Sequence, residues 1–270
     1  MRGVILKESE ILKSALEGDV GKKPLETLRI MTKKYLSEGK SKDEIFEELN
    51  EYMEDNYIGY KASKWNNLLL QMIKSVSKYN NYDIIDVDGI VITENEWNSI
   101  IALNNKQLEK LAFILLVYQK INIIKNPESN GWINQNYTDI FKEASVGSKL
   151  SGNDQRKLLN QLYKLDYISQ KHSCDATSLK INYIDIESDI KIVVDNFINV
   201  ITYYDEYRNG VKYIKCEVCN KRVEQKTNNQ KYCNRCSKSI DNINRNTRKR
   251  GMSDSERFIK ASNINGLRAF

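Results

Sequence analysis

The chain has 270 residues, with 42 Lys and Arg, 36 Asp and Glu and a single histidine, which gives a formal net charge of +6. This length can bury a sizeable core, and we expect more than one domain. No apolar run approaches the roughly 18 residues of a membrane span and the start of the chain lacks a signal-peptide pattern, so we expect a cytoplasmic protein with no membrane partner.

The basic charge is concentrated in two blocks. Residues 212–270 carry 15 Lys and Arg against five Asp and Glu, and residues 106–172 carry ten against six. Such blocks are expected of proteins that contact nucleic acid. A Lys-rich surface that merely keeps the protein soluble is the alternative. It fits the block at 106–172 equally well, but it fits the C-terminal block poorly.

Residues 1–82 predict a helical domain. Apolar residues recur at helical spacing in residues 22–38, in a segment that follows Ser41, and in residues 63–79. Gly39 is predicted to end the first helix in a left-handed conformation, and Ser41 with Glu44 form a capping box for the second. Nothing here indicates chemistry, so we expect a module that forms a homodimer or recruits a partner protein.

Residues 83–104 predict a hairpin and a short helix that link two domains. Asp88-Gly89 between apolar runs is a hairpin signal, and Thr93 with Glu96 form another capping box. Asp86 and Asp88 would share one face of a strand, so a Mg²⁺ site is conceivable. The turn explains most of the pattern without a metal.

Residues 105–184 resemble a winged helix-turn-helix domain, on the order and length of the expected elements. A strongly apolar helix comes first, followed by a short strand at 131–133, helices at 137–144 and 154–165, and two strands at 167–171 and 179–183 around a polar turn at 173–177. The resemblance covers about 80 residues and includes no sequence signature.

The resemblance implies that the helix at 154–165 is the recognition helix. Its leucines are expected to pack inward: Leu158, Leu159, Leu162 and Leu165. Its polar face carries side chains that can read bases in a major groove, namely Gln155, Arg156, Asn160, Gln161 and Lys164. Lys157 and Lys171 would contact phosphates. Two alternatives stay open, because winged helices also dock proteins and polar helix faces can simply be solvated.

Residues 185–211 are interpreted as a link, acidic and then aromatic, with a short helix before a strand at 211–214. Residues 212–240 hold two cysteine pairs, Cys216 with Cys219 and Cys233 with Cys236, at the spacing of a four-thiolate zinc ribbon. Polar residues 220–232 would return the second pair to the first, and Zn²⁺ would supply the folding energy. The fifth cysteine, Cys174, is interpreted as a plain small residue.

Residues 241–270 are interpreted as a basic tail without a convincing apolar stripe. Lys and Arg side chains of the ribbon and tail are predicted to lie along phosphates: Lys221, Arg222, Lys226, Lys231, Arg235, Lys238, Arg245, Arg248, Lys249 and Arg250. The alternative is a disordered tail that keeps the protein soluble.

Enzyme classes are disfavoured by the residue inventory. The only histidine, His172, falls in the expected wing, which excludes His-Glu-x-x-His proteases and zinc-associated HNH nucleases. Phosphate-binding and dinucleotide-binding glycine motifs are missing from the sequence. A zinc ion held by four thiolates has no open coordination position, so it would be structural.

The whole chain resembles uncharacterised phage and prophage proteins of low-GC Gram-positive bacteria that combine a winged-helix-like middle with a C-terminal four-cysteine ribbon. The resemblance implies a role in replication or transcription regulation. We therefore expect a mainly α, multidomain, non-enzymatic DNA-binding protein. A module that inhibits or redirects host proteins and an RNA-binding protein are the alternatives.

Overall fold

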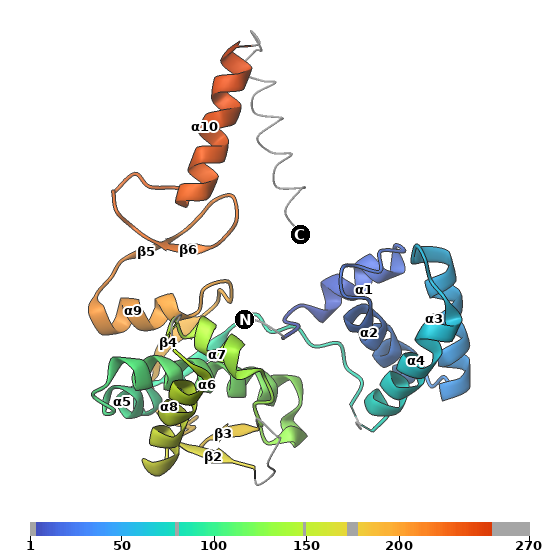
Figure 1. Ribbon diagram of the computed structural model, residues 1–270, viewed down its shortest axis with the longest axis horizontal. Helices are drawn as coiled ribbons and strands as arrows, with labels where there is room; N and C mark the ends of the chain where they lie inside the picture. The colour runs from blue at the N-terminus through green and yellow to red at the C-terminus, as the bar shows by residue number, and fades with distance from the viewer. Residues whose placement is uncertain (1–3, 79–80, 148–149, 172–177, 250–270) are drawn as a thin grey trace. The chain divides into compact units, whose positions relative to one another are not determined.

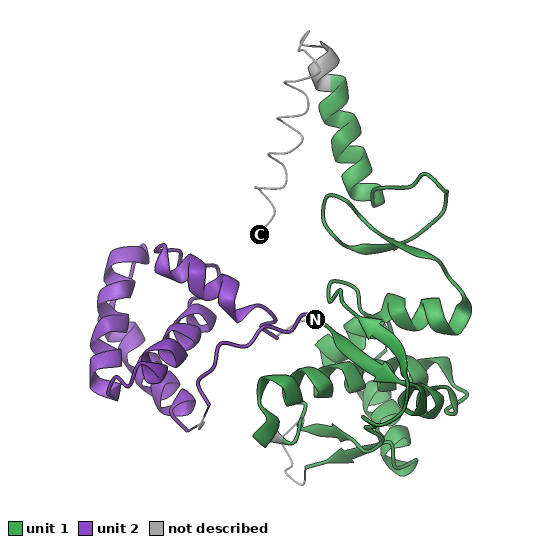
Figure 2. Cartoon of the chain, turned by 180° about the vertical axis from the view of Figure 1, so that it is seen from behind, with its two compact units in different colours: residues 1–3, 89–270 green, residues 4–88 purple. Residues whose placement is uncertain are grey.

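The computed structural model describes residues 4–78, 81–147, 150–171 and 178–249. These residues form ten α-helices and three two-stranded sheets, so the chain is mainly helical (Figure 1). The chain divides into two compact units, residues 4–88 and residues 89–270, the second of which also includes residues 1–3 (Figure 2). Within the described part, no helix has the length and apolarity needed to cross a membrane.

The unit at 4–88 is a small helical bundle. Its helices are α1 (Glu8–Leu16), α2 (Pro24–Ser37), α3 (Lys42–Asn56) and α4 (Ala62–Val76). Fully buried Leu28, Ile45 and Leu49 lie in its core. The capping box of Ser41 and Glu44 is present, and Gly39 has a φ of +80°, so both predicted helix signals are confirmed. Helix α1 was not among the helices predicted from the sequence.

The predicted hairpin at Asp88-Gly89 is wrong. The strand β1 (Ile90–Thr93) pairs antiparallel with β4 (Ile190–Val194), while the segment before it runs along the start of the chain, with Val87 N–H donating to the Leu6 carbonyl at 2.8 Å. Pairing with β4 places Ile92 beside Ile192 on the buried side of the sheet, which a local turn could not do.

Helix α6 (Lys106–Lys125) is the centre of the second unit. Residues 111–118 are fully buried, and the helix contacts α5 (Glu94–Ile101) and α9 (Ile201–Asn209). The capping box of Thr93 and Glu96, which starts α5, is confirmed. The buried carboxylate of Glu109 accepts hydrogen bonds from Tyr204 Oη at 2.6 Å and Arg208 Nε at 2.9 Å. The segment 185–211 therefore contributes β4 and α9 to this core; its helix was predicted but β4 was not.

The elements of residues 105–184 follow the predicted order. After α6 come the 3-10 turn η1 (Pro127–Ser129), an antiparallel bridge between Ile133 and Leu179, α7 (Tyr137–Glu143), α8 (Gly152–Lys164), β2 (Ile168–Gln170) and β3 (Leu179–Ile181). Because β2 pairs with β3 and Ile133 bridges β3, three short segments lie side by side. The predicted polar turn at 173–177, with Cys174, and His172 lie outside the described residues.

The C-terminal part is a hairpin followed by a helix. The strand β5 (Tyr213–Lys215) pairs antiparallel with β6 (Arg222–Glu224), and α10 (Asn234–Lys249) follows (Figure 1). We call residues 212–249 the cysteine module. The predicted basic tail, residues 241–270, begins inside α10, so residues 241–249 are helical. Residues 250–270 lie outside the described part of the chain.

Candidate metal centre and nucleic-acid interface

Four cysteine thiols converge in the cysteine module. The sulfur atoms of Cys216, Cys219, Cys233 and Cys236 all lie within 4.8 Å of one another, and Sγ of Cys219 and Sγ of Cys233 are 3.9 Å apart. Four sulfurs at 2.3 Å from a tetrahedral ion would be separated by about 3.8 Å. The cluster therefore has the dimensions needed to bind one metal ion.

Backbone hydrogen bonds shape both cysteine turns. In the first turn, which connects β5 to β6, Cys216 N–H donates to the Lys221 carbonyl at 3.0 Å, and Asn220, with a φ of +54°, donates to the Cys216 carbonyl at 2.9 Å. In the second, Cys236 N–H donates to Cys233 Sγ at 3.4 Å at the start of α10. The hairpin thus encloses the first cysteine pair and the start of a helix holds the second, whereas we had expected a short hairpin or loop at residues 220–232 between the two pairs.

The surroundings of the thiols differ in polarity. Burial acts to raise the pKa of Cys216, but hydrogen bonds from the backbone of Cys233, Cys219 and Val218 outweigh it and lower that pKa to about 7. Burial and the neighbouring thiols raise the pKa of Cys236 to about 12. The Cys216 thiol therefore ionises more readily than the Cys236 thiol. A bound metal ion would favour the thiolate form of both.

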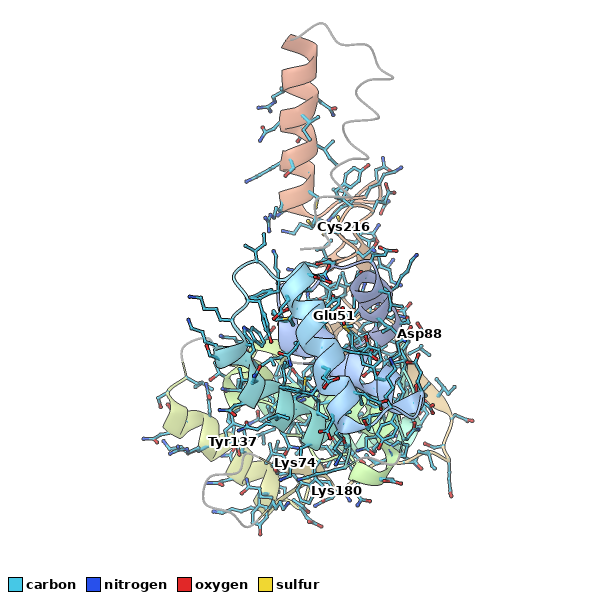
Figure 3. The ribbon with its side chains drawn as sticks, turned by 90° about the vertical axis from the view of Figure 1, so that its right-hand side faces the viewer. Glu51, Lys74, Asp88, Tyr137, Lys180 and Cys216 are labelled. Carbon is cyan, nitrogen blue, oxygen red and sulfur yellow. The ribbon has the colours of Figure 1, made fainter. Side chains whose placement is uncertain are left out.

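The chemistry of the cluster is that of a closed site. Cys216, Cys233 and Cys236 are buried and Cys219 is half-buried, and Val218, Val223 and Tyr232 pack around them. Figure 3 shows Cys216 at the base of α10. Four soft sulfur ligands would leave a tetrahedral ion without an open position for substrate. The arrangement can hold the hairpin and α10 together.

Arg222 has a structural position that the sequence analysis did not foresee. Its side chain is buried between the cysteine module and α9: the guanidinium lies over the ring of Tyr203 and pairs with Glu206. Since this cation already has an aromatic and an acidic partner, its placement argues against the predicted contact with phosphate, and we leave it out of the candidate interface.

Other contacts between the module and the 195–199 segment went unnoticed in the sequence. Lys215 Nζ lies 2.7 Å from one carboxylate oxygen of Asp195, and the other oxygen accepts a hydrogen bond from Tyr203 Oη. Asn196 Nδ2 donates to the Asn220 carbonyl at 2.5 Å. No sequence pattern predicts these contacts, because each is made by a single polar residue within a polar stretch. Together the contacts hold the first cysteine turn beside α9.

A groove of about 1130 Å³ separates part of the module from α9. Lys221, Lys226 and Arg235 line it, but so do three carboxylates, Asp205, Glu217 and Glu224. Because both signs of charge mix along its walls, the groove by itself does not favour a polyanion over other ligands.

The outer face of α8 is the second candidate surface. Leu158, Leu159 and Leu162 are buried, as predicted, and hold the opposite face against the core. Most of the predicted base-reading residues are exposed, namely Arg156, Asn160, Gln161 and Lys164, whereas Gln155 is half-buried. The helix therefore presents mainly basic and amide groups to solvent.

Leu165 departs from its prediction. We expected it to pack inward, but 54% of its surface is exposed. The helix ends at Lys164, and Asp166 adopts a left-handed φ of +60°, so the chain turns away before Leu165 can continue the buried face.

The remaining predicted contacts have varied surroundings. Lys157 pairs with Asp154 at 3.0 Å and Lys231 lies 3.7 Å from Glu217, while Lys171 is exposed at the end of β2. On α10, Arg235, Lys238 and Arg245 are exposed. The side chains of Arg248 and Lys249, and the whole of Arg250, lie outside the described part of the structure.

Asp86 and Asp88 have protein partners. The Asp86 carboxylate accepts from Ser9 N–H at 3.0 Å and from its hydroxyl, and Asp88 pairs with Lys7. These contacts account for both carboxylates without the Mg²⁺ that the sequence analysis had considered. Among the described residues, the four cysteines form the one group that could hold a metal ion.

Comparison of the chain with known protein families, with curated proteins and with solved structures finds no match.

Proposed function

We propose that this protein is a non-enzymatic DNA-binding protein of a phage or other mobile element, acting in replication or transcription regulation. The domain at 105–184 reads the DNA, and the cysteine module, holding one Zn²⁺, adds affinity for phosphates. The observation that carries the proposal is the outer face of α8, where Arg156, Asn160 and Lys164 are all exposed while the opposite face is fixed in the core.

The elements around α8 support a winged-helix assignment of this domain. Helices α7 and α8 lie between the Ile133 bridge and the β2–β3 hairpin, which is the order in which a helix-turn-helix is followed by a wing. In such a domain the second helix of the pair enters the major groove, where Arg pairs with guanine and Asn with adenine. Lys171, exposed directly after β2, is placed to reach a phosphate.

Zn²⁺ is the metal that we propose for the four thiols. Tetrahedral sites of four sulfurs favour Zn²⁺ or iron, and a single ion held by two Cys-x2-Cys turns is typical of structural zinc. It would keep the hairpin and α10 in one arrangement, since a module of this size buries little apolar surface apart from the cluster.

Binding of labelled duplex DNA across a salt series tests the proposal. We expect affinity to fall steeply with salt, and the Arg156→Ala/Lys164→Ala double variant to bind at least about tenfold more weakly with a shallower salt dependence. Lys74→Ala, which removes an exposed lysine from the other unit, is the matched control. It should change neither the affinity for DNA nor the salt dependence of binding. If the wild type binds DNA at low salt no more tightly than it binds a neutral polymer, the proposal is refuted. If RNA outcompetes duplex DNA, the protein is an RNA-binding protein instead.

Protein interaction is the second candidate function, favoured by an exposed apolar pair. Val91 of β1 and Val193 of β4 are cross-strand partners that are 38% and 51% exposed, and Ile190 nearby is 63% exposed. An interaction module would keep its partner after the Arg156→Ala/Lys164→Ala change but lose it after Val193→Lys. A DNA-binding protein would show the reverse dependence.

A further inference from the structure

The face of α10 that lies opposite the cysteine cluster carries a regular set of polar side chains. Arg235, Lys238, Asn242 and Arg245 follow one another at intervals of three, four and three residues, and all four are exposed. Residues at this spacing lie on one face of a helix. Cys236, Ile240 and Ile243 repeat at similar intervals and occupy the other face, where Cys236 is buried and the two isoleucines are half-buried.

The cysteine cluster fixes this helix at its first turn. Cys236 lies within the helix and Cys233 immediately before it, and Ser237 N–H donates to the Cys233 carbonyl at 2.9 Å. Two sulfurs bound to one ion would set the rotation of α10 about its own axis as well as its starting point. The polar face must then point away from the metal. Figure 1 shows α10 extending beyond the β5–β6 hairpin.

The size and charge of the polar face match a DNA major groove. From Arg235 to Arg245 the helix rises about 15 Å, which corresponds to about four base pairs at 3.4 Å each. The major groove of B-DNA is about 12 Å wide and admits a helix. Arg235, Lys238 and Arg245 form no ion pair with a carboxylate among the described residues. Arg235 also lines the groove beside α9 that holds Asp205, Glu217 and Glu224, whereas Lys238 and Arg245 lie outside it. The single carboxylate of α10, Asp241, lies at the edge of the face.

We infer that α10 is a second DNA-reading helix, aimed by the cysteine cluster, whose Arg235–Lys238–Asn242–Arg245 face enters the major groove of duplex DNA. Asn242 and Arg245 contact base edges, where an amide pairs with adenine and a guanidinium with guanine. Arg235 and Lys238 contact the flanking phosphates. The inference rests on the proposed function and deepens it, since the sequence had suggested only a basic tail lying along phosphates.

Duplex DNA is favoured over double-stranded RNA by the shape of the groove. The major groove of A-form RNA is deep and too narrow for side chains to read, so a regular helix with an amide at its centre would lose the contacts that Asn242 provides. Phosphate contact alone would explain the three cations but would give Asn242 no role.

Selection from a random duplex library with the full chain tests the inference. The wild type is expected to enrich a site with two sequence blocks. Asn242→Ala should lose the preference at one block and bind the wild-type site at least about tenfold more weakly, while Asn160→Ala on α8 should lose the other block. Asn228→Ala, an exposed asparagine in the loop after β6, is the matched control and should select the wild-type site. Equal metal content in all four proteins shows that the module is intact.

Some negative results would overturn the role of α10 alone, and others would overturn the proposed function as well. If Asn242→Ala selects the wild-type site with wild-type affinity, α10 reads no bases, and the inference is overturned while DNA binding through α8 stands. Binding without any enriched sequence also overturns it. Failure of the wild type to bind duplex DNA at low salt, or enrichment from an RNA library instead, overturns both.

Discussion

The guanidinium carbon of Arg222 lies 3.7 Å from the centre of the Tyr203 ring. Arg222 belongs to β6 beside the cysteine cluster, and Tyr203 belongs to α9, which packs on the central helix α6. A cation over an aromatic face, shielded from water, stabilises more than the same pair on the surface. This contact therefore ties the cysteine module to α9, two segments that the sequence analysis had separated.

Removing the Arg222 guanidinium should destabilise this junction. We expect Arg222→Ala to lower the free energy of unfolding by about 1–3 kcal/mol, because Tyr203 and Glu206 lose a buried partner. Arg222 Nε is buried without a hydrogen-bond partner in the described part of the chain. This unpaired donor offsets part of the stability that the guanidinium contributes, so we expect a loss at the low end of the range. Urea unfolding measures the change.

The matched control for this variant is Arg235→Ala in the same module. Arg235 is exposed, so its removal should change the free energy of unfolding by no more than about 0.5 kcal/mol. Arg222→Lys keeps the charge but not the planar group, so an intermediate loss is expected. Equal stability of all these proteins would show that the stacking contact does not stabilise the junction.

Metal removal should unfold the cysteine module. We expect purified protein to carry one zinc per chain, and Cys236→Ser to lose it, because the buried cluster would be left with three thiolates. Elemental analysis measures the zinc, and protease digestion should cut within 212–249 once the ion is chelated. Cys174→Ser, which changes the one cysteine outside the cluster, should keep the metal. Protein that holds well under one zinc per chain after mild purification would argue against the site.

Acid should weaken the junction between the cysteine module and the 195–199 segment by protonating Asp195. Hydrogen bonds from Lys215 and Tyr203 lower the pKa of this carboxyl below its ordinary value near 3.8. A group whose pKa is lower in the folded state contributes stability above its unfolded pKa and loses that contribution as the pH falls through the folded pKa. The difference in stability between wild type and Asp195→Asn should thus be constant from about pH 7 to pH 5 and shrink below about pH 4.

Denaturant unfolding at several pH values checks this dependence. The matched control is Asp205→Asn on α9, which removes the partner of Lys110, 2.9 Å away, but leaves the contacts of Asp195 in place. If the difference between wild type and Asp195→Asn grows on acidification instead, the hydrogen bonds to Asp195 do not stabilise the folded state.

Local signals in the sequence predicted local structure well. The capping boxes at Ser41 and Thr93 mark the starts of α3 and α5 because a side chain and a backbone N–H three residues apart satisfy each other wherever the rest of the chain lies. The cysteine spacing located the candidate metal site for the same reason: each pair bends its own short turn.

Long-range pairing could not be predicted in this way. The Asp88-Gly89 signal favours a local hairpin, yet β1 pairs with a strand 100 residues away, since burial of Ile92 beside Ile192 outweighs the local turn. Arg222 illustrates the same limit at the site. Its neighbours in sequence, Lys221 and Val223, give no sign of a buried partner, and only the position of Tyr203 in space shows that this candidate phosphate ligand is a structural residue.

Leu162 of α8 and Leu165, which follows the helix, should respond very differently to truncation. Leu162 is fully buried and Leu165, which the apolar spacing placed on the same face, is 54% exposed beyond the end of the helix. Leu162→Ala should therefore cost about 2–5 kcal/mol of unfolding free energy, through lost apolar burial and the cavity left behind, whereas Leu165→Ala should cost about 0.5 kcal/mol or less. Urea unfolding of both variants measures the contrast. Similar large losses for the two would mean that the buried face of α8 extends past Lys164, and the orientation of Arg156, Asn160 and Lys164 on its outer face would have to be revised with it.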